Sequence, residues 1–327
     1  MNVLVTGGAG YVGSHALPEL KRAGHTPVVF DNLSEGHAAA VGDARLIRGD
    51  LRDEAQIASA LEESGAEAVM HFAASAYVGE SVEDPQKYYF NNTVNSLRLL
   101  RAMLTVGVDK LVFSSSCTLY GVPDEVPITE DQPVRPINPY GRTKAAVENA
   151  LSDYAEAYGL KYASLRYFNA AGAAPDGSIG EDHDPETHLI PLVIHAALGK
   201  RDHIAIFGTD YPTPDGTCIR DYVHVTDLAT AHVAAMEALD ERPVMIYNLS
   251  TGRGASVREV IETVGRVSGR EIKVVEADRR AGDPPELVGS PQKVRRELGW
   301  EPRYPELEQV VETAWRWHST HPDGFED

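Results

Sequence analysis

The stretch that most constrains the fold lies at the start of the chain, where a short apolar run leads into a glycine-rich turn. Val3-Leu4-Val5 has the apolar, β-favouring character of a strand, and Thr6-Gly7-Gly8-Ala9-Gly10-Tyr11-Val12-Gly13 follows it directly. Beyond this turn, apolar residues recur at helical spacing. Glycines in such a turn let the backbone approach a pyrophosphate at a helix N-terminus. The order strand, glycine turn, helix therefore predicts the first unit of a dinucleotide-binding fold.

A carboxylate at the end of the next expected strand specifies the kind of dinucleotide. The apolar run Pro27-Val28-Val29-Phe30 ends at Asp31, 18 residues beyond Gly13 and near the offset of a ribose-binding carboxylate. Such a carboxylate repels a 2'-phosphate, and residues 32–37 contain no Arg or Lys. We therefore expect NAD and not NADP. Pro18 removes a backbone donor from the first helix, so we expect a kink there and not the end of the helix.

The alternation of strand and helix continues to about residue 170. Apolar runs indicate strands, and the stretches between them are long enough for helices; the expected elements are strands at 45–48, 68–72, 110–113 and 161–166 and helices at 53–63 and 85–105. This order predicts an α/β fold, a Rossmann-type doubly wound parallel sheet. We expect residues 1–170 to form the NAD-binding domain, rejoined by parts of 223–250. Residues 171–327 should form mainly a smaller, mixed α/β substrate lobe.

A second motif predicts acid–base chemistry at one edge of this sheet. Asn138-Pro139 favours a helix start, so Tyr140 and Lys144 should lie one turn apart on the same helix face. An ammonium and a cationic cofactor ring beside the phenol could lower its pKa by roughly three units, worth about 4 kcal/mol. Ser116, at the end of the 110–113 strand, would link the phenol to a substrate hydroxyl. For the Tyr–Lys pair alone, a surface tyrosine near a solvated lysine is the commoner arrangement, so other motifs must decide.

Composition and charge exclude several classes of partner. The net charge is −19, from 30 basic and 49 acidic side chains, which argues against binding of nucleic acid. We find no signal-peptide pattern and no apolar run of membrane-spanning length, so we expect a soluble, cytoplasmic protein without a membrane partner. Cys117 and Cys218 form neither a disulfide framework nor a zinc-binding spacing, and we expect no metal site.

Taken together, these motifs resemble a known family. The glycine turn with Asp31, the run Ser114-Ser115-Ser116 before a Tyr-Gly pair, and Tyr140-x-x-x-Lys144 are similar to the extended short-chain dehydrogenase/reductases that act on nucleotide sugars. The resemblance is closest to the UDP-glucose 4-epimerase branch and covers essentially the whole chain. The segments that carry it are Val78–Ser81, Leu165–Asn169, Ile206–Gly216 and Arg220–His224.

The resemblance implies a role for individual residues. Ser116, Tyr140 and Lys144 would be catalytic. NAD would be held by Gly7, Gly10, Tyr11, Val12, Gly13, Asp31, Asn32, Asp50, Leu51, Phe72, Ala73, Ala74, Asn91, Ser114, Tyr140, Lys144 and Tyr167. The UDP-sugar would be held by Ser116, Asn169, His188, Leu189, Phe207, Arg220, Arg280, Asp283 and Leu287. Helices around 85–105 and 140–158 would pair two copies of the chain into a homodimer.

The implied reaction is interconversion of UDP-glucose and UDP-galactose through a transient 4-keto sugar, with NAD returned unchanged. The sequence departs from the best-known epimerases at three positions. His188 stands where Asn is common, Ala76 replaces a lysine, and Leu287 lies where a bulky Tyr narrows the sugar pocket of some relatives. The smaller Leu287 leads us to expect some activity on UDP-GlcNAc and UDP-GalNAc.

Three alternatives stay open at this stage. The first is a nucleotide-sugar dehydratase or decarboxylase of the same fold. Dehydratases resemble one another in carrying acidic residues at this strand end, whereas this chain has Cys117-Thr118 there. Epimerisation of another nucleotide sugar or at another carbon is the second. A non-catalytic NAD-binding regulator is the third, and its sequence would not need Ser116, Tyr140 and Lys144 together.

Overall fold

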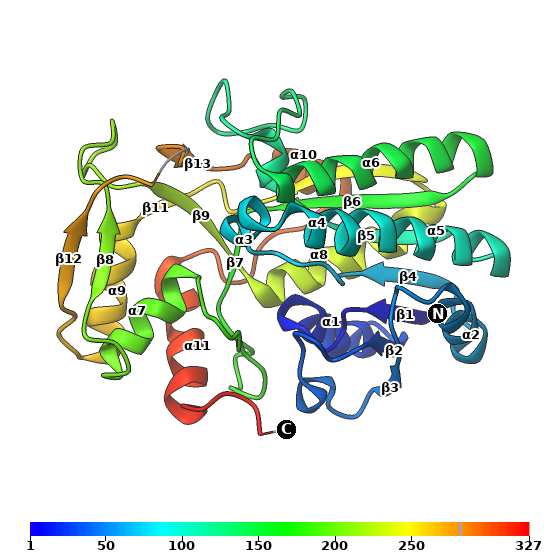
Figure 1. The fold of residues 1–327 in the computed structure, drawn as a ribbon, viewed down its shortest axis with the longest axis horizontal. Coiled ribbons are helices and arrows are strands. Elements are labelled where there is room, and N and C mark those ends of the chain that lie inside the picture. The colour runs from blue at the N-terminus through cyan, green and yellow to red at the C-terminus, as the bar shows by residue number, and fades with distance from the viewer. Residues whose placement is uncertain (281–282, 327) are drawn as a thin grey trace.

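The computed structural model describes residues 1–280 and 283–326, and its largest element is a seven-stranded parallel sheet (Figure 1). The strand order is β10-β6-β5-β4-β1-β2-β3. The bounds are β1 (Asn2–Thr6), β2 (Thr26–Asp31), β3 (Arg45–Arg48), β4 (Ala68–His71), β5 (Lys110–Ser116), β6 (Lys161–Tyr167) and β10 (Val244–Leu249). The chain reverses its direction of travel across the sheet after β3, which gives a doubly wound arrangement.

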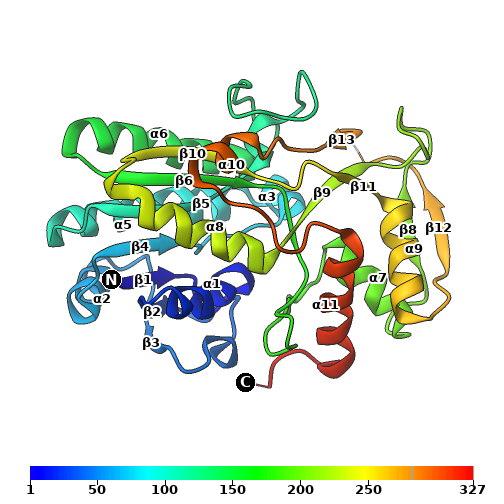
Figure 2. The same cartoon turned by 180° about the vertical axis from the view of Figure 1, so that it is seen from behind.

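Helices cover both faces of this sheet, because alternate strand residues point to opposite sides. Val3 and Val5 pack with α1 (Tyr11–Arg22) and α8 (Val225–Glu237) on one face. Leu4 packs on the other face in a second core. The helices of that face are α2 (Glu54–Ser64), α5 (Asn95–Val106) and α6 (Pro139–Tyr158). Figures 1 and 2 show these two helical layers from opposite sides.

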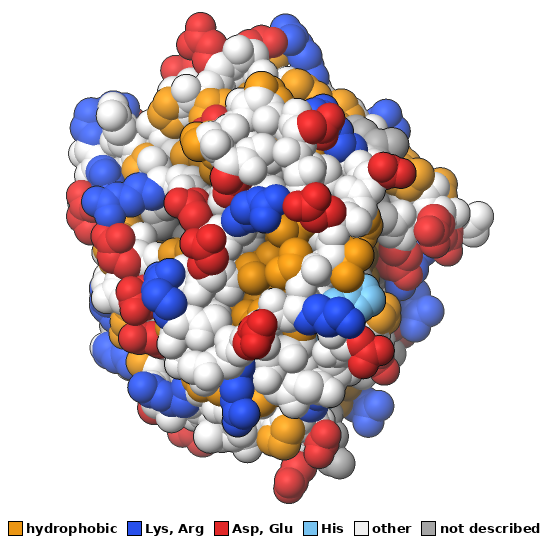
Figure 3. Space-filling model, turned by 90° about the vertical axis from the view of Figure 1, so that its left-hand side faces the viewer, with side chains coloured by type: hydrophobic (Ala, Val, Ile, Leu, Met, Phe, Trp, Pro, Cys, Tyr) orange, Lys and Arg blue, Asp and Glu red, His pale blue; other side chains and the backbone are white. Residues whose placement is uncertain are grey.

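A smaller lobe stands at the carboxyl ends of the central strands (Figure 1). One of its sheets contains β7 (Asn169–Ala171), β9 (Ile219–His224), β11 (Gly254–Ser256) and β13 (Glu286–Leu287), and the other pairs β8 (Ile204–Phe207) with β12 (Val274–Ala277). Its helices are α7 (Leu189–Ala197), α9 (Val257–Ser268) and α11 (Leu307–Thr320), which share one apolar core. A further helix, α10 (Gln292–Leu298), packs against β10. On the outer face of this lobe, acidic and basic side chains are interspersed (Figure 3).

One predicted helix is divided in the structure, and another continues past its internal proline, as expected. The helix predicted at 85–105 is divided into α4 (Pro85–Tyr88), a π-helical turn (Tyr89–Val94) and α5, and it follows the short helix α3 (Val78–Glu83). Asn91 and Asn92 of the π-helical turn hydrogen-bond to Ser75 in the loop after β4, a kind of contact that periodicity does not report. α1 continues as one helix through Pro18 to Arg22. None of the helices in the described part of the chain combines the length and apolarity that a membrane span requires.

Candidate active site

The carboxyl ends of β1, β4, β5 and β6 meet at the edge of the sheet that faces the smaller lobe (Figure 1). In open α/β sheets this is where ligands bind. The sequence places its glycine turn, its serine run and its Tyr–Lys helix after or beside these strand ends. The fold therefore brings together motifs that are more than 100 residues apart in the chain.

The glycine turn packs too tightly for side chains at two of its positions. Gly7 has φ +72°, and a Cβ there would lie 2.7 Å from the Cα of Ala73. A Cβ on Gly13 would collide with the carbonyl oxygen of Gly7 and lie 2.9 Å from the Cα of Gly8. Gly10 is different, because its only close neighbour would be the Gly7 oxygen at 3.4 Å. Gly10 therefore keeps a face of the turn open, while Gly7 and Gly13 let backbone segments touch.

The start of α1 is a natural anion site. Gly10 is its N-cap residue, and no side chain accepts a hydrogen bond from the first turn. The backbone N–H groups and the positive end of the helix are thus directed at the open face beside Gly10. This cradle and its donors fit the diphosphate of a dinucleotide.

Asp31 and Asp50, two of the predicted NAD contacts, lie close together at the ends of β2 and β3. Asp31, at the end of β2, accepts hydrogen bonds from the backbone N–H of Ala9 at 3.0 Å and of Leu33 at 2.9 Å. Asn32 donates to Asp50 at 2.9 Å, and Arg52 donates to the same carboxylate at 2.7 Å. The Arg52 hydrogen bond is the largest favourable cause that lowers the pKa of Asp50 to about 2. Both carboxylates have further lone pairs for hydroxyl groups.

A buried amide network positions the strand end of β4. Asn92 in the π-helical turn accepts from the N–H of Ser75 at 2.8 Å and donates to the Ser75 carbonyl at 3.0 Å. Asn92 also donates to Thr143 of α6 at 3.2 Å, and Asn91 donates to the Ser75 hydroxyl at 3.0 Å. The sequence predicts a site role for Asn91 but misses Asn92 and Thr143. Asparagine is unfavourable inside a helix, so the position of Asn92 within the predicted 85–105 helix was the signal that could have identified it.

Ser116, Tyr140 and Lys144 come together as predicted. Asn138 caps α6 by accepting from the N–H of Gly141 at 2.8 Å, and the helix then carries Tyr140 and Lys144 inward. Their exposed fractions are 8% and 3%, and Ser116 is exposed by 6%. Lys144 Nζ donates to the carbonyl of Ser114 at 2.7 Å and lies 5.8 Å from the Tyr140 ring centroid. One phenol, one hydroxyl and one lysine amine therefore share a buried corner.

The pKa directions correct part of the expectation for Tyr140. Burial raises the pKa of Tyr140 above 10; Tyr167 adds to this effect, and a hydrogen bond with Ser116 opposes it. Burial also lowers the pKa of Lys144 to about 7. Lys144 is itself desolvated and is not among the groups that lower the pKa of Tyr140. The chain's own groups thus leave Tyr140 protonated at neutral pH, and a further positive charge is needed beside it.

The other predicted cofactor contacts border the same corner. Tyr167, at the end of β6, shares a 2.6 Å hydrogen bond with the Ser114 hydroxyl. Phe72 and Ala73 follow β4, and both backbone N–H groups donate to the Thr6 carbonyl, at 2.9 and 3.1 Å.

The predicted substrate residues gather on the small lobe's four-stranded sheet. Arg220 on β9 forms an ion pair with Asp283, and its register partner on β13 is Leu287. Asn169 on β7 is the register partner of Tyr222 on β9, and it donates to the carbonyl of Asp221 at 3.1 Å. Burial raises the pKa of Asp221 to about 6, while four hydrogen bonds from nearby loops act in the opposite direction. Asp221 therefore organises the loops around Arg220, a role that sequence reasoning missed.

The rest of the predicted substrate contacts are one aromatic residue, one arginine and two residues at the start of a helix. The guanidinium of Arg280 lies 4.0 Å from the ring centroid of Phe207, at the end of β8. His188 is the N-cap residue of α7, and Leu189 is the first residue of that helix. The His188 Nδ1 atom faces two carboxylates, Glu181 at 2.8 Å and Glu186 at 2.9 Å. Glu181 and Glu186 belong to no recognisable sequence motif and were not predicted.

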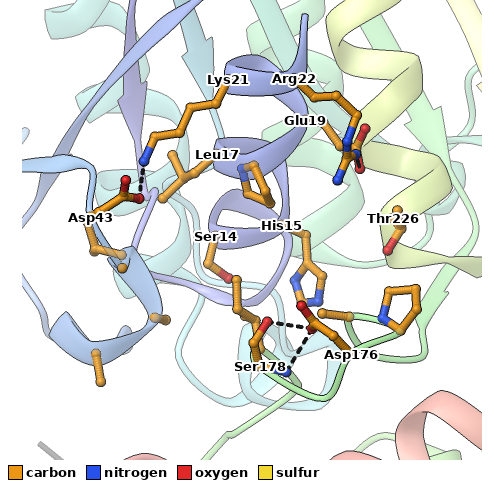
Figure 4. Close-up of a pocket in the computed structure, with 18 residues that line it drawn as sticks. Ser14, His15, Leu17, Glu19, Lys21, Arg22, Asp43, Asp176, Ser178 and Thr226 are labelled. Atoms are coloured by element: carbon orange, nitrogen blue, oxygen red, sulfur yellow. Dashed lines mark hydrogen bonds and ion pairs between the residues drawn. The ribbon is translucent and has the colours of Figure 1, made fainter.

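A cavity of about 430 Å³ lies elsewhere, between α1 and the loop at 174–179 (Figure 4). Charged side chains at its rim already pair with one another, since Lys21 binds Asp43 and Arg22 binds Glu19. None of the described residues that line it belongs to the predicted catalytic or substrate set. We therefore do not assign the reaction to this cavity.

Comparison with known proteins agrees with this geometry. Residues 3–250 match the NAD-dependent epimerase/dehydratase family. The chain belongs to this family. It is 51% identical, over 99% of its length and 98% of the relative's, to the UDP-glucose 4-epimerase of Halalkalibacterium halodurans. Membership of this family accounts for the presence of both the glycine turn and the Ser–Tyr–Lys group in one chain.

Solved structures of family members superpose on almost the whole chain. The Brucella ovis UDP-glucose 4-epimerase in complex with NAD is 52% identical, with a TM-score of 0.94 and coverage of 97% of this chain and 98% of that one. The UDP-Glc/GlcNAc 4-epimerase of Campylobacter jejuni is 42% identical, with a TM-score of 0.86 and coverage of 97% and 99%. The predicted Rossmann-type fold is confirmed, and NAD is the cofactor of this family.

Proposed function

We propose that the chain is an NAD-dependent 4-epimerase that interconverts UDP-glucose and UDP-galactose. The observation that carries the proposal is the buried corner formed by Ser116, Tyr140 and Lys144 at the carboxyl ends of β5 and β6. A glycine turn that fits NAD lies at the same sheet edge, and an arginine-bearing sheet faces it. Full-length similarity to curated UDP-glucose 4-epimerases supports the same reaction.

The chain's own residues move and hold a proton. Bound NAD supplies a hydride acceptor at C4 of the hexose, and later the hydride donor. Tyr140, as the phenolate, accepts the proton of the C4 hydroxyl and returns it after the 4-keto sugar has turned over. Ser116 hydrogen-bonds that hydroxyl, and Thr118 orients Ser116 by donating to its Oγ at 3.0 Å. Lys144, fixed on the Ser114 carbonyl, holds Tyr140 and the cofactor side of the site in place.

The remaining predicted contacts are part of the proposal. The NAD contacts are Gly7, Gly10, Tyr11, Val12, Gly13, Asp31, Asn32, Asp50, Leu51, Phe72, Ala73, Ala74, Asn91, Ser114, Tyr140, Lys144 and Tyr167. The nucleotide-sugar contacts are Ser116, Asn169, His188, Leu189, Phe207, Arg220, Arg280, Asp283 and Leu287. In this division residues 1–170 with α8 and β10 hold NAD, and residues 171–327 mainly hold the UDP-sugar.

Turnover of a keto sugar inside the pocket requires a firm hold on UDP and a loose hold on the hexose. Arg220 and Arg280 are cations at the small lobe, and guanidinium groups bind phosphates bidentately. The hexose side carries hydroxyl and apolar groups such as Ser116 and Leu287. A 4-epimerase needs this asymmetry, whereas a dehydrogenase that releases its reduced cofactor does not need it.

The test is an equilibrium assay of the purified protein with UDP-galactose, with and without added NAD. Formation of UDP-glucose with no net NADH supports 4-epimerisation. No conversion by a preparation that binds NAD would refute it and direct attention to another nucleotide sugar. A parallel UDP-GalNAc sample tests the role of Leu287, since Leu287→Tyr should reduce activity on the N-acetyl sugar more than on UDP-galactose.

We also propose a homodimer through the helices at 85–105 and 140–158. Their outer surfaces expose large apolar side chains: Tyr89 by 41%, Phe90 by 57%, Leu97 by 37%, Leu104 by 48% and Tyr158 by 58%. Such a cluster is typical of a protein interface. Sedimentation velocity measures the oligomeric state.

The cytoplasmic location expected from the sequence stays a prediction, as does the absence of nucleic-acid and membrane partners.

A further inference from the structure

Four side chains with metal-ligating atoms converge in the loop that leads into α7. Glu181, His183, Glu186 and His188 each present one such atom, and these atoms all lie within 4.8 Å of one another. The His183 Nδ1 atom lies 3.2 Å from Glu181 and 3.7 Å from Glu186. The His188 Nδ1 atom lies 2.8 Å from Glu181 and 2.9 Å from Glu186. The expectation of no metal site considered only cysteines, and these ligands are imidazoles and carboxylates.

The separations suit a small ion at the centre of the group. Bonds of about 2.0–2.2 Å from zinc to nitrogen and oxygen give ligand–ligand separations of roughly 3.3–3.6 Å in a tetrahedron. The four nitrogen–oxygen separations here range from 2.8 to 3.7 Å. The two Glu186 distances are to different oxygens of its carboxylate, and one ligand atom from each residue lies within 4.8 Å of the others, so side-chain adjustment would bring one atom of each residue onto a tetrahedral ion.

The cluster also leaves buried polar atoms without hydrogen bonds. The Glu181 side chain is exposed by only 4%, and its Oε1 atom has no hydrogen-bond partner. The His183 Nδ1 atom is likewise buried and unpartnered, although the two atoms are 3.2 Å apart. Proximity without hydrogen-bond alignment is costly for two buried polar groups. A cation between them would satisfy both atoms, because coordination bonds converge on a point.

We propose that Glu181, His183, Glu186 and His188 bind one divalent transition-metal ion, with zinc as the best match. Two carboxylates and two neutral imidazoles carry a charge of −2, which balances the ion. Four protein ligands leave no open coordination position, so the ion is structural and takes no part in the hydride or proton transfer.

The surroundings support a site that fastens the loop. Glu186 Oε1 accepts hydrogen bonds from the backbone N–H of Thr187 at 2.6 Å and of His188 at 2.7 Å, which orients this ligand. The ring of His183 packs edge-on against Tyr11, the first residue of α1, with centroids 6.1 Å apart. It packs similarly against Tyr77, the N-cap residue of α3, at 5.9 Å. The ion would thus hold α1, α3 and the start of α7 together beside the nucleotide-sugar contacts.

The competing arrangement uses protons in place of a metal. Burial lowers the pKa of both imidazoles, but Glu181 and Glu186 outweigh it and raise the pKa of His183 to about 9 and of His188 to about 10. Two imidazolium–carboxylate pairs would then form an ion-pair network without an ion. The two arrangements differ in a measurable way, since metal binding displaces the imidazole protons.

The test uses the full chain, stripped with a chelator, dialysed and titrated with zinc chloride in a calorimeter at pH 7.5. We expect one ion per chain with a Kd of about 1 μM or below, and proton release that scales with the buffer ionisation heat. Cobalt chloride should give the strong visible absorption of four-coordinate Co²⁺. In His183→Gln we expect affinity to fall about 100-fold, while the exposed His203→Gln control binds as the unaltered chain does.

Two results would overturn the proposal. One is the absence of saturable zinc binding and of the cobalt absorption in the unaltered chain. The other is equal zinc affinity in His183→Gln, which would place the ion elsewhere. If His183→Gln fails to fold, Glu186→Gln replaces it, with the exposed Glu271→Gln as its matched control. The epimerase assay is not used as a readout, so failure of this site leaves the proposed reaction unaffected.

Discussion

Single methyl groups at two glycines of the nucleotide turn should have separable effects. A Cβ on Gly13 would lie 2.9 Å from the Cα of Gly8 and would collide with the Gly7 carbonyl. A Cβ on Gly10 would meet only that carbonyl, at an ordinary 3.4 Å, and the Gly10 backbone at φ −83° is open to alanine. We therefore expect Gly13→Ala to disturb the fold, and Gly10→Ala to disturb only what approaches the open face.

The magnitudes follow from these contacts. Ordinary carbon–carbon contacts are about 3.5–4.0 Å, so Gly13→Ala must displace backbone by several tenths of an ångström or more. Overpacking of this kind costs about 1–3 kcal/mol of unfolding free energy. Gly10→Ala should cost less than about 0.5 kcal/mol in the NAD-free protein. Loss of one or two hydrogen bonds to the diphosphate would weaken NAD binding about 10- to 100-fold in either variant.

The assay combines urea unfolding of the NAD-free protein with calorimetric titration of NAD. Gly265→Ala in α9 is the matched control, since its Cβ would have only ordinary contacts, none nearer than 3.5 Å. We expect this control to keep NAD affinity and to gain stability slightly, because alanine favours helix over glycine. Two results would refute the assignment of the open face. One is an unfolding free energy of Gly10→Ala as low as that of Gly13→Ala, and the other is an NAD affinity of Gly10→Ala within twofold of that of the unaltered chain.

Three further predictions concern the buried corner and the core. Tyr140→Phe should reduce kcat about 10²- to 10⁴-fold with NAD affinity nearly kept, measured by conversion of UDP-galactose; a loss below tenfold would remove Tyr140 as the base. Lys144 has a folded pKa of about 7, below its unfolded value, so stability is full above pH 10 and declines as pH falls toward 7. Lys144→Met should abolish this slope in melting of the NAD-free protein between pH 7 and 9.5; an equal slope contradicts it. Glu148→Gln should cost about 3–5 kcal/mol in urea unfolding, because Arg166, 2.6 Å away, loses its buried partner; the exposed Glu156→Gln control should be neutral, and a loss below about 1 kcal/mol contradicts the pairing.

The sheet and its strand ends were predictable from local sequence. Strands read from apolar runs at 45–48, 110–113 and 161–166 are present, and the part of 223–250 expected to rejoin the domain includes β10, which pairs with β6. These predictions are correct because a buried parallel strand imposes its composition directly on the sequence. The same reasoning placed Ser116 at a strand end, and the helix start at Asn138-Pro139 placed Tyr140 and Lys144 one turn apart on the helix that carries both.

Features that depend on distant side chains were not predictable. The π-helical turn at Tyr89–Val94 contains Asn92, whose hydrogen-bond partners Ser75 and Thr143 lie 17 and 51 residues away. Asp221 orients loops that contain Thr251 and Gly289, which periodicity cannot report. The cluster at 181–188 was overlooked because loop residues give no periodic signal and a search based on cysteines ignores imidazole–carboxylate sets.

The pKa of Tyr140 links the fold to the direction of the chemistry. Hydride removal from a carbinol requires a base for the hydroxyl proton, yet burial of Tyr140 and of Lys144 favours the neutral form of each group. Tyr140 therefore becomes a competent base only when a fixed positive charge lies beside it, as the oxidised nicotinamide ring of NAD would provide. Loss of that charge on reduction of the cofactor would restore the preference of the Tyr140 phenol for its proton. The apolar burial that makes Tyr140 a poor acid in the chain alone thus ties proton transfer to the redox state of the cofactor.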